Sequence, residues 1–86
     1  MRLDKYLKVS RIIKRRTVAN DACSQGRVQL NGKVAKPGSE VQIGDTICIQ
    51  FGDKQRCYEV LAISEHVPKD GAALMYRMLP ENSGQP

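Results

Sequence analysis

The chain has few of the residues on which most enzymes depend. It contains no tryptophan, one phenylalanine, three tyrosines and a single histidine, His66, among 86 residues. No serine or cysteine can be placed beside His66 from the sequence, so a catalytic triad is unsupported. The aspartates are scattered singly among lysines and arginines, where an acidic side chain is normally an ion-pair partner. No P-loop spacing occurs. We therefore expect a protein that is not an enzyme.

Cysteine is also scarce, and its spacing excludes the common metal sites. Cys23, Cys48 and Cys57 form no CxxC pair, so we expect no metal and no cofactor. We expect all three to be small apolar side chains with free thiols in a reducing cytosol. The chain is charged directly after Met1, and no apolar run approaches the roughly 20 residues of a membrane span. These features predict a cytoplasmic protein that binds no membrane.

Positive charge, in contrast, is abundant and unevenly distributed. The net charge is +5, yet the first 36 residues hold ten lysines and arginines against two aspartates, which gives +8. The remaining residues hold four cations against seven acids, which gives −3. Such segregation produces a field of one sign that attracts polyanions, and it favours nucleic acid as the partner. A solvated basic face, or a small module whose basic face meets an acidic protein, is the alternative.

Apolar periodicity predicts two short helices at the N-terminus. The first runs over 2–10, and its buried face would consist of Leu3, Tyr6, Leu7 and Ser10. Asp4 lies one turn before Lys8, and this spacing predicts an ion pair between them. After a buried link at 12–13, the second helix runs from about 15 to 25, with one apolar arc made of Val18, Ala19, Ala22 and Cys23. Gly26 follows, at the place where a helix end needs positive φ.

The rest of the chain has the signals of a small antiparallel sheet. Asn31 and Gly32 predict a type I′ hairpin turn, and strands are expected at 46–51, 57–63 and, less clearly marked, 74–79. The aromatic residues of the strands are expected in the core. The prediction is an α+β fold, with two N-terminal helices packed on a small twisted antiparallel sheet. Residues 1–79 would form a single domain, and 80–86 a disordered tail.

The cations of the N-terminal half are candidates for phosphate binding. Guanidinium groups bind phosphate oxygens bidentately, and backbone N–H groups at a helix start favour anions. The chain has few aromatic rings for base stacking, and Asp21 would repel phosphate in a DNA groove, so we expect structured RNA and not DNA. The candidate RNA-binding residues are Arg2, Lys5, Lys8, Arg11, Lys14, Arg15, Arg16, Arg27 and Lys33. Gly26, Asn31 and Gly32 are expected to have structural roles in turns.

Three segments together carry a family resemblance: RLDKYL, KRRTVANDACSQGRVQLNGK and KPGSEVQIGDTICI. They resemble the alpha-L RNA-binding motif, which is found in ribosomal protein S-four and at the end of tyrosyl-tRNA synthetases. The motif core would span residues 2–50. Its common form has Ser-Arg before the second helix, whereas this chain has Arg15-Arg16. The usual capping serine is therefore replaced, and charge is added where phosphate would sit.

Among free-standing copies of the motif, the chain is similar to the RqcP (YabO) family and to the bacterial heat-shock protein fifteen group. The RqcP resemblance implies a quality-control factor on large ribosomal subunits that carry a stalled peptidyl-tRNA. The implied partners are large-subunit rRNA, peptidyl-tRNA and an RqcH-like factor that adds C-terminal alanine tails. It also implies that Arg2 and Arg16 contact rRNA. The second resemblance implies the alternative, a heat-shock recycling factor of the large subunit without a tailing role.

Overall fold

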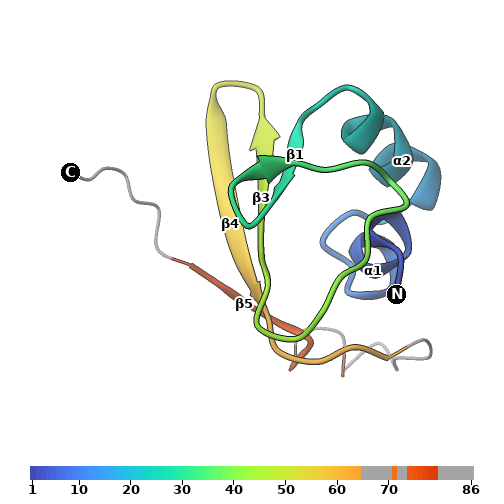
Figure 1. Cartoon of the computed structure of the whole chain (residues 1–86), viewed down its shortest axis with the longest axis vertical. Coiled ribbons are helices and arrows are strands. Elements are labelled where there is room, and N and C mark those ends of the chain that lie inside the picture. The colour runs from blue at the N-terminus through green and yellow to red at the C-terminus, as the bar shows by residue number, and fades with distance from the viewer. Residues whose placement is uncertain (65–70, 72–73, 80–86) are drawn as a thin grey trace.

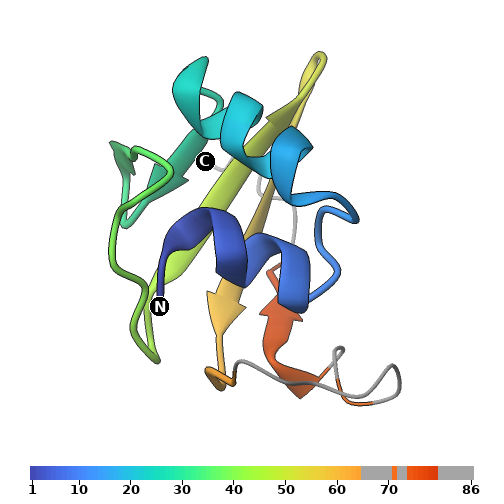
Figure 2. The same cartoon turned by 90° about the vertical axis from the view of Figure 1, so that its right-hand side faces the viewer.

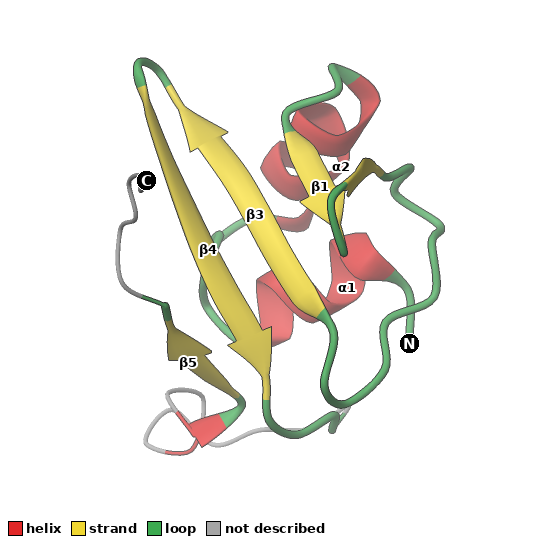
Figure 3. Cartoon of the chain, turned by 60° about the vertical axis from the view of Figure 1, so that its left-hand side comes forward, coloured by secondary structure: helices red, strands yellow, loops and turns green. Residues whose placement is uncertain are grey.

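The fold combines two short helices with one antiparallel sheet (Figure 1). The computed structural model describes residues 1–64, 71 and 74–79. The helices are α1 (Leu3–Val9) and α2 (Arg16–Ser24), and the strands are β1 (Val28–Leu30), β2 (Lys33–Val34), β3 (Thr46–Phe51), β4 (Lys54–Val60) and β5 (Tyr76–Met78). The strand order is β2-β1-β3-β4-β5, with every pair antiparallel. Both helices cover one face of the twisted sheet (Figure 3). The predicted α+β architecture is confirmed.

Helix α1 depends on tertiary contacts, because seven residues are too few for a stable isolated helix. All four residues of its predicted inner face are buried, as expected. The N–H groups of Leu3 and Asp4, which have no partner inside the helix, donate to the carbonyls of Ser39 (2.8 Å) and Pro37 (3.1 Å). The segment 37–41 therefore holds the start of α1 in place.

Helix α2 buries small residues and ends as the sequence predicted. Ala19 and Cys23 are buried, but Val18 is exposed, so the predicted apolar arc was one residue too wide. Gly26 has a φ of +76°. Its N–H donates to the Cys23 carbonyl, and the next N–H, of Arg27, donates to the Ala22 carbonyl. This pair of bonds is the Schellman motif, in which a left-handed residue closes the helix.

The hairpin turns explain the register of the sheet. Asn31 (φ +55°) and Gly32 (φ +87°) both have positive φ, which confirms the type I′ turn. The strand expected at 46–51 is confirmed as β3. Strand β4 (Lys54–Val60) begins and ends three residues earlier than the strand predicted at 57–63. It begins at Lys54 because the two-residue turn Gly52-Asp53 pairs Phe51 directly with Lys54. This turn was not predicted from the sequence. The segment 74–79 contains β5, as predicted.

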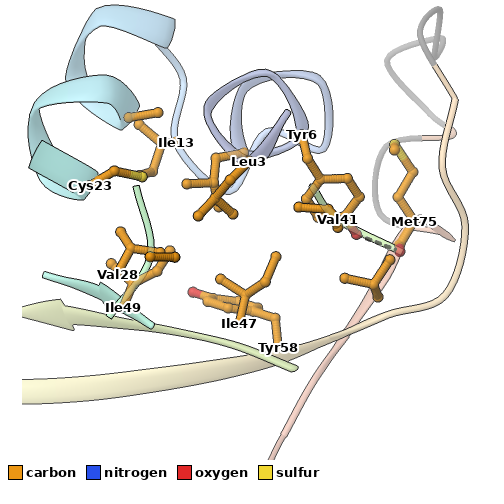
Figure 4. Close-up of a cluster of buried hydrophobic side chains, with 14 residues drawn as sticks. Leu3, Tyr6, Ile13, Cys23, Val28, Val41, Ile47, Ile49, Tyr58 and Met75 are labelled. Carbon is orange, nitrogen blue, oxygen red and sulfur yellow. Dashed lines mark hydrogen bonds between the residues drawn. The ribbon is translucent and has the colours of Figure 1, made fainter. Parts of the chain in front are cut away.

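The core lies between the helices and the inner face of the sheet (Figure 4). Burying one of its large aliphatic side chains, such as Leu3 or Ile47, contributes about 1.5–3 kcal/mol to the free energy of folding. The Tyr6 hydroxyl donates a 2.8 Å hydrogen bond to the Met75 carbonyl, which ties α1 to the segment before β5. Burial raises the pKa of this tyrosine well above its ordinary value. Tyr58 is buried as expected, but Phe51 is 42% exposed, so its placement in the core was wrong.

The expectation of three free thiols is wrong for two of the cysteines. Cys48 and Cys57 lie directly opposite each other on β3 and β4, with their Cα atoms 4.0 Å apart, and form a disulfide. Strand alternation places this bond on the face of the sheet away from the helices. Cys23 is a free, buried thiol, as predicted. Burial, together with the negative charge of Asp4, raises its pKa to about 11.

Some predictions fall on residues that the structure does not describe. His66 and the tail expected at 80–86 lie outside the described residues. Within the described part, neither helix is long and apolar enough to cross a membrane.

Candidate RNA-binding surface

The basic surface is organised around one buried acidic side chain, Asp4. Its side chain is only 3% exposed. Arg2 donates through Nε to Asp4 Oδ1 (3.2 Å) and through Nη2 to Oδ2 (3.3 Å). Arg16, from the first turn of α2, places its Nη2 3.5 Å from Oδ1. One carboxylate therefore joins arginines from the starts of both helices.

Asn20 completes the environment of Asp4. Its Nδ2 donates to Oδ2 at 3.4 Å. Burial raises the pKa of Asp4, but the hydrogen bonds from Asn20 and Arg2 and the charges of Arg16 and Arg2 outweigh this effect and lower the pKa below 3.8. The carboxylate is therefore ionised at neutral pH. The predicted pairing of Asp4 with Lys8 is wrong, because packing of α2 against α1 surrounds Asp4 with closer partners.

Most of the hydrogen-bonding capacity of the two arginines remains available to a ligand. The side chains of Arg2 and Arg16 are 55% and 47% exposed. A guanidinium has five N–H donors, and only two from Arg2 and one from Arg16 are directed at Asp4. The carboxylate thus orients the groups and leaves donors for phosphate oxygens.

The start of α2 adds further positive character. Arg15 is the N-cap residue, with extended backbone, and its side chain makes no capping hydrogen bond. The replacement of the usual serine therefore leaves the first N–H groups of α2 without a side-chain cap. These groups and the exposed Arg15 and Arg16 lie together at the positive end of the helix dipole.

The other predicted cations are distributed more widely. Lys5 (half-buried) and Lys8 belong to α1, Arg11 directly follows α1, and Lys14 lies in the link to α2. Arg27 follows the opposite end of α2, and Lys33 lies on β2. The structure therefore brings Arg2, Arg15 and Arg16 together at the helix starts, and it places Arg27 and Lys33 apart from them.

A shallow open pocket of about 320 Å³ lies beside the Asp4 cluster. It was not predicted from the sequence. Its lining consists of Asp4, Arg16, Thr17, Asn20 and Asp21. One signal was available: the i,i+4 spacing of Arg16 and Asn20 places both on one face of a helix. The pocket offers both donors and acceptors, which suits ribose hydroxyls or base edges better than phosphate.

The chain is similar to several known proteins. The S4 domain family matches residues 1–47, which cover both helices and the start of β3. The chain is 49% identical over 81 residues to the RQC P-site tRNA stabilizing factor of Halalkalibacterium halodurans, covering 94% of this chain and 92% of that protein. The protein of the same name from Bacillus subtilis is 47% identical, and the match covers 94% of each chain.

A solved structure shows the same fold. The trimeric Heat Shock Protein 15 of Vibrio cholerae superposes with a TM-score of 0.83 at 32% identity, covering 92% of this chain and 81% of that one. The match extends beyond the S4 segment into the later strands. Together these similarities show that the chain belongs to the S4 domain family and, within it, to the family of RQC P-site tRNA stabilizing factors.

Proposed function

We propose that this protein is a non-enzymatic factor that binds large ribosomal subunits obstructed by peptidyl-tRNA. In this role it contacts large-subunit rRNA and the tRNA in the cytoplasm. It supports an RqcH-like factor that adds alanine tails to stalled chains. The names of its relatives, which describe stabilisation of P-site tRNA, support this assignment.

The single observation that carries the proposal is the carboxylate shared by Arg2 and Arg16. An arginine that is already oriented loses less side-chain entropy on binding than a freely rotating one. Two such groups, at the starts of the two helices, form a fixed pair of phosphate contacts. Phosphate contacts position a protein on folded RNA, and the shape of the RNA supplies specificity.

The test is binding to purified large subunits as a function of salt. If about six phosphates are neutralised, affinity falls on the order of a thousandfold between about 50 and 200 mM salt. Co-sedimentation over this range measures the slope directly. A flat salt response, or no co-sedimentation in dilute buffer, overturns the proposal.

The second candidate is a heat-shock recycling factor that binds the same subunits without a tailing role. The similarity to Heat Shock Protein 15 favours it. Deleting the gene separates the two, since only a tailing factor is needed for alanine tails on stalled chains. Loss of tails supports the first function, and unchanged tails with impaired large-subunit recycling support the second.

A further inference from the structure

The end of the β3–β4 hairpin forms an exposed corner that the helices do not cover. Figure 2 views the molecule from the side of the helices and shows this turn extending past α2. Ile47 and Ile49 of β3 are buried beneath the helices, and strand alternation directs Phe51 to the same side. Phe51 is nevertheless 42% exposed, and it is not among the residues that pack against the core.

The nearest neighbours of Phe51 in the sheet are charged or polar. Lys54 lies directly opposite it, and Arg56 faces the same side, opposite Ile49. Arg56 Nη1 lies 3.9 Å from the sulfur of Met78. Asp53 in the turn carries the opposing charge, so Asp53, Lys54 and Arg56 together have a net charge of +1.

The hairpin end lies against the turn that follows α2. The Gln50 N–H donates a 2.9 Å hydrogen bond to the Arg27 carbonyl. Arg27, one of the candidate RNA-binding residues, therefore lies beside the hairpin end. Its exposed side chain adds a further cation to this corner of the molecule.

Among the phenylalanine and tyrosine rings, all of which the structure describes, the ring of Phe51 is the most exposed. Tyr6 and Tyr58 are buried and Tyr76 is half-buried, so the other three rings face the core or its edge. Sites for unpaired nucleotides combine an exposed ring, on which a base stacks, with cations that follow the backbone. A protein partner would need a wider apolar patch and would desolvate Lys54, so the neighbours of Phe51 favour RNA.

We propose that Phe51 stacks on an unpaired base of the bound RNA, while Lys54 and Arg56 contact its phosphates. The inference rests on the proposed function, because it extends the same RNA-binding surface to the hairpin. The base belongs either to the rRNA or to the P-site tRNA. Both sources offer the same chemistry, a nucleotide outside a helix.

The experiment measures the affinity of the full chain for large subunits, with and without P-site peptidyl-tRNA, at several salt concentrations. Phe51→Leu removes the ring but keeps an apolar side chain, and we expect about 5- to 100-fold weaker binding with an unchanged salt slope. Phe51→Trp keeps the stacking surface and binds at least as tightly as the unchanged protein. Lys54→Gln lowers the salt slope by about 1. The matched control is Ile43→Ala, an exposed apolar residue beyond the other end of β3, which leaves affinity unchanged.

Weaker binding of Phe51→Leu to bare subunits assigns the base to rRNA, and weaker binding only to tRNA-loaded subunits assigns it to tRNA. If the Phe51→Leu protein binds as tightly as the unchanged protein, or if the Phe51→Trp protein binds as weakly as Phe51→Leu, the stacking proposal is overturned. If Arg16→Ala is impaired while Phe51→Leu is not, only this inference fails. If the unchanged protein does not bind large subunits, the proposed function fails with it.

Discussion

Arg2, directly before α1, and Arg16, the first residue of α2, contact the same carboxylate. Arg2 Nε lies 3.2 Å and Arg16 Nη2 3.5 Å from Oδ1 of Asp4. Arg2 precedes α1 and Arg16 opens α2, so this contact sets the position of one helix start relative to the other. A surface for folded RNA needs such fixed spacing, because its phosphates lie at fixed distances from one another.

Arg16→Ala is expected to weaken binding to large subunits by about 10- to 100-fold, as loss of a charge-assisted hydrogen bond implies. Stability should change by no more than about 1 kcal/mol, because Arg16 is half exposed. The matched control is Arg77→Ala, which removes the same charge from an arginine paired with Glu59 on β4. Sedimentation binding and urea unfolding measure the two effects. An Arg16→Ala protein that unfolds like a core mutant would make Arg16 a structural residue.

Asp4→Asn distinguishes positioning from simple electrostatics. Removing a negative charge makes the surface more positive, so a purely electrostatic surface would bind RNA more tightly. If Asp4 positions the arginines, binding should instead weaken by about 5- to 10-fold. Asp21→Asn is the control, since Asp21 is an exposed residue of the same pocket that makes no ion pair with the arginines, and this variant should bind RNA equally well or more tightly. Tighter binding by Asp4→Asn would contradict the positioning role.

The acid stability of the protein should depend on Asp4. Its pKa is lowered in the folded state, so the unfolded chain binds more protons and stability rises with pH in this range. The contribution is fully present above the ordinary aspartate value of 3.8 and is lost as the pH falls through the folded value. Urea unfolding between about pH 2 and 6 should therefore show a steeper loss for the unchanged protein than for Asp4→Asn. If stability falls equally with pH in both proteins, Asp4 does not contribute to acid stability.

Arg11 occupies a backbone conformation that glycine usually adopts. It follows the C-cap of α1 with a φ of +64°, and its N–H donates to the Lys8 carbonyl. A left-handed conformation costs a non-glycine residue about 1 kcal/mol. Arg11→Gly should therefore stabilise the fold by about 0.5–1 kcal/mol while weakening RNA binding. Arg11→Ala should weaken binding equally without the gain in stability, and thermal unfolding with a binding assay separates the two. If Arg11→Gly destabilises the fold, the backbone at Arg11 is not strained.

Reduction of the Cys48–Cys57 disulfide should lower stability without changing RNA binding. The bond closes a loop of about ten residues, for which chain entropy gives about 2–3 kcal/mol. It lies on the face of the sheet opposite the helices, so Arg2 and Arg16 should keep their geometry. Urea unfolding with and without reductant measures the first effect. Thiol titration of the unfolded chain should find one free thiol before reduction and three after. Loss of RNA binding on reduction would show that the disulfide also supports the RNA-binding surface.

Local sequence signals determined most of the secondary structure. The apolar face of α1, the helix end at Gly26 and the turn at Asn31-Gly32 follow from interactions within a few residues. The strand β3 was also evident, because its β-branched and aromatic residues form a short run between turn signals. The clustering of cations in the first half of the chain likewise pointed to a polyanionic partner.

Tertiary packing determined which side chains contact one another. Asp4 contacts Arg2 and Arg16 instead of the expected Lys8, and the contact with Arg16 forms because α2 packs across α1 and encloses the carboxylate. Cys48 and Cys57 became bonded because a two-residue turn brought them into register. Phe51 stayed exposed because no helix covers the end of the β3–β4 hairpin. Periodicity and propensity act over a few residues, whereas burial and cross-strand register depend on where distant segments come to lie.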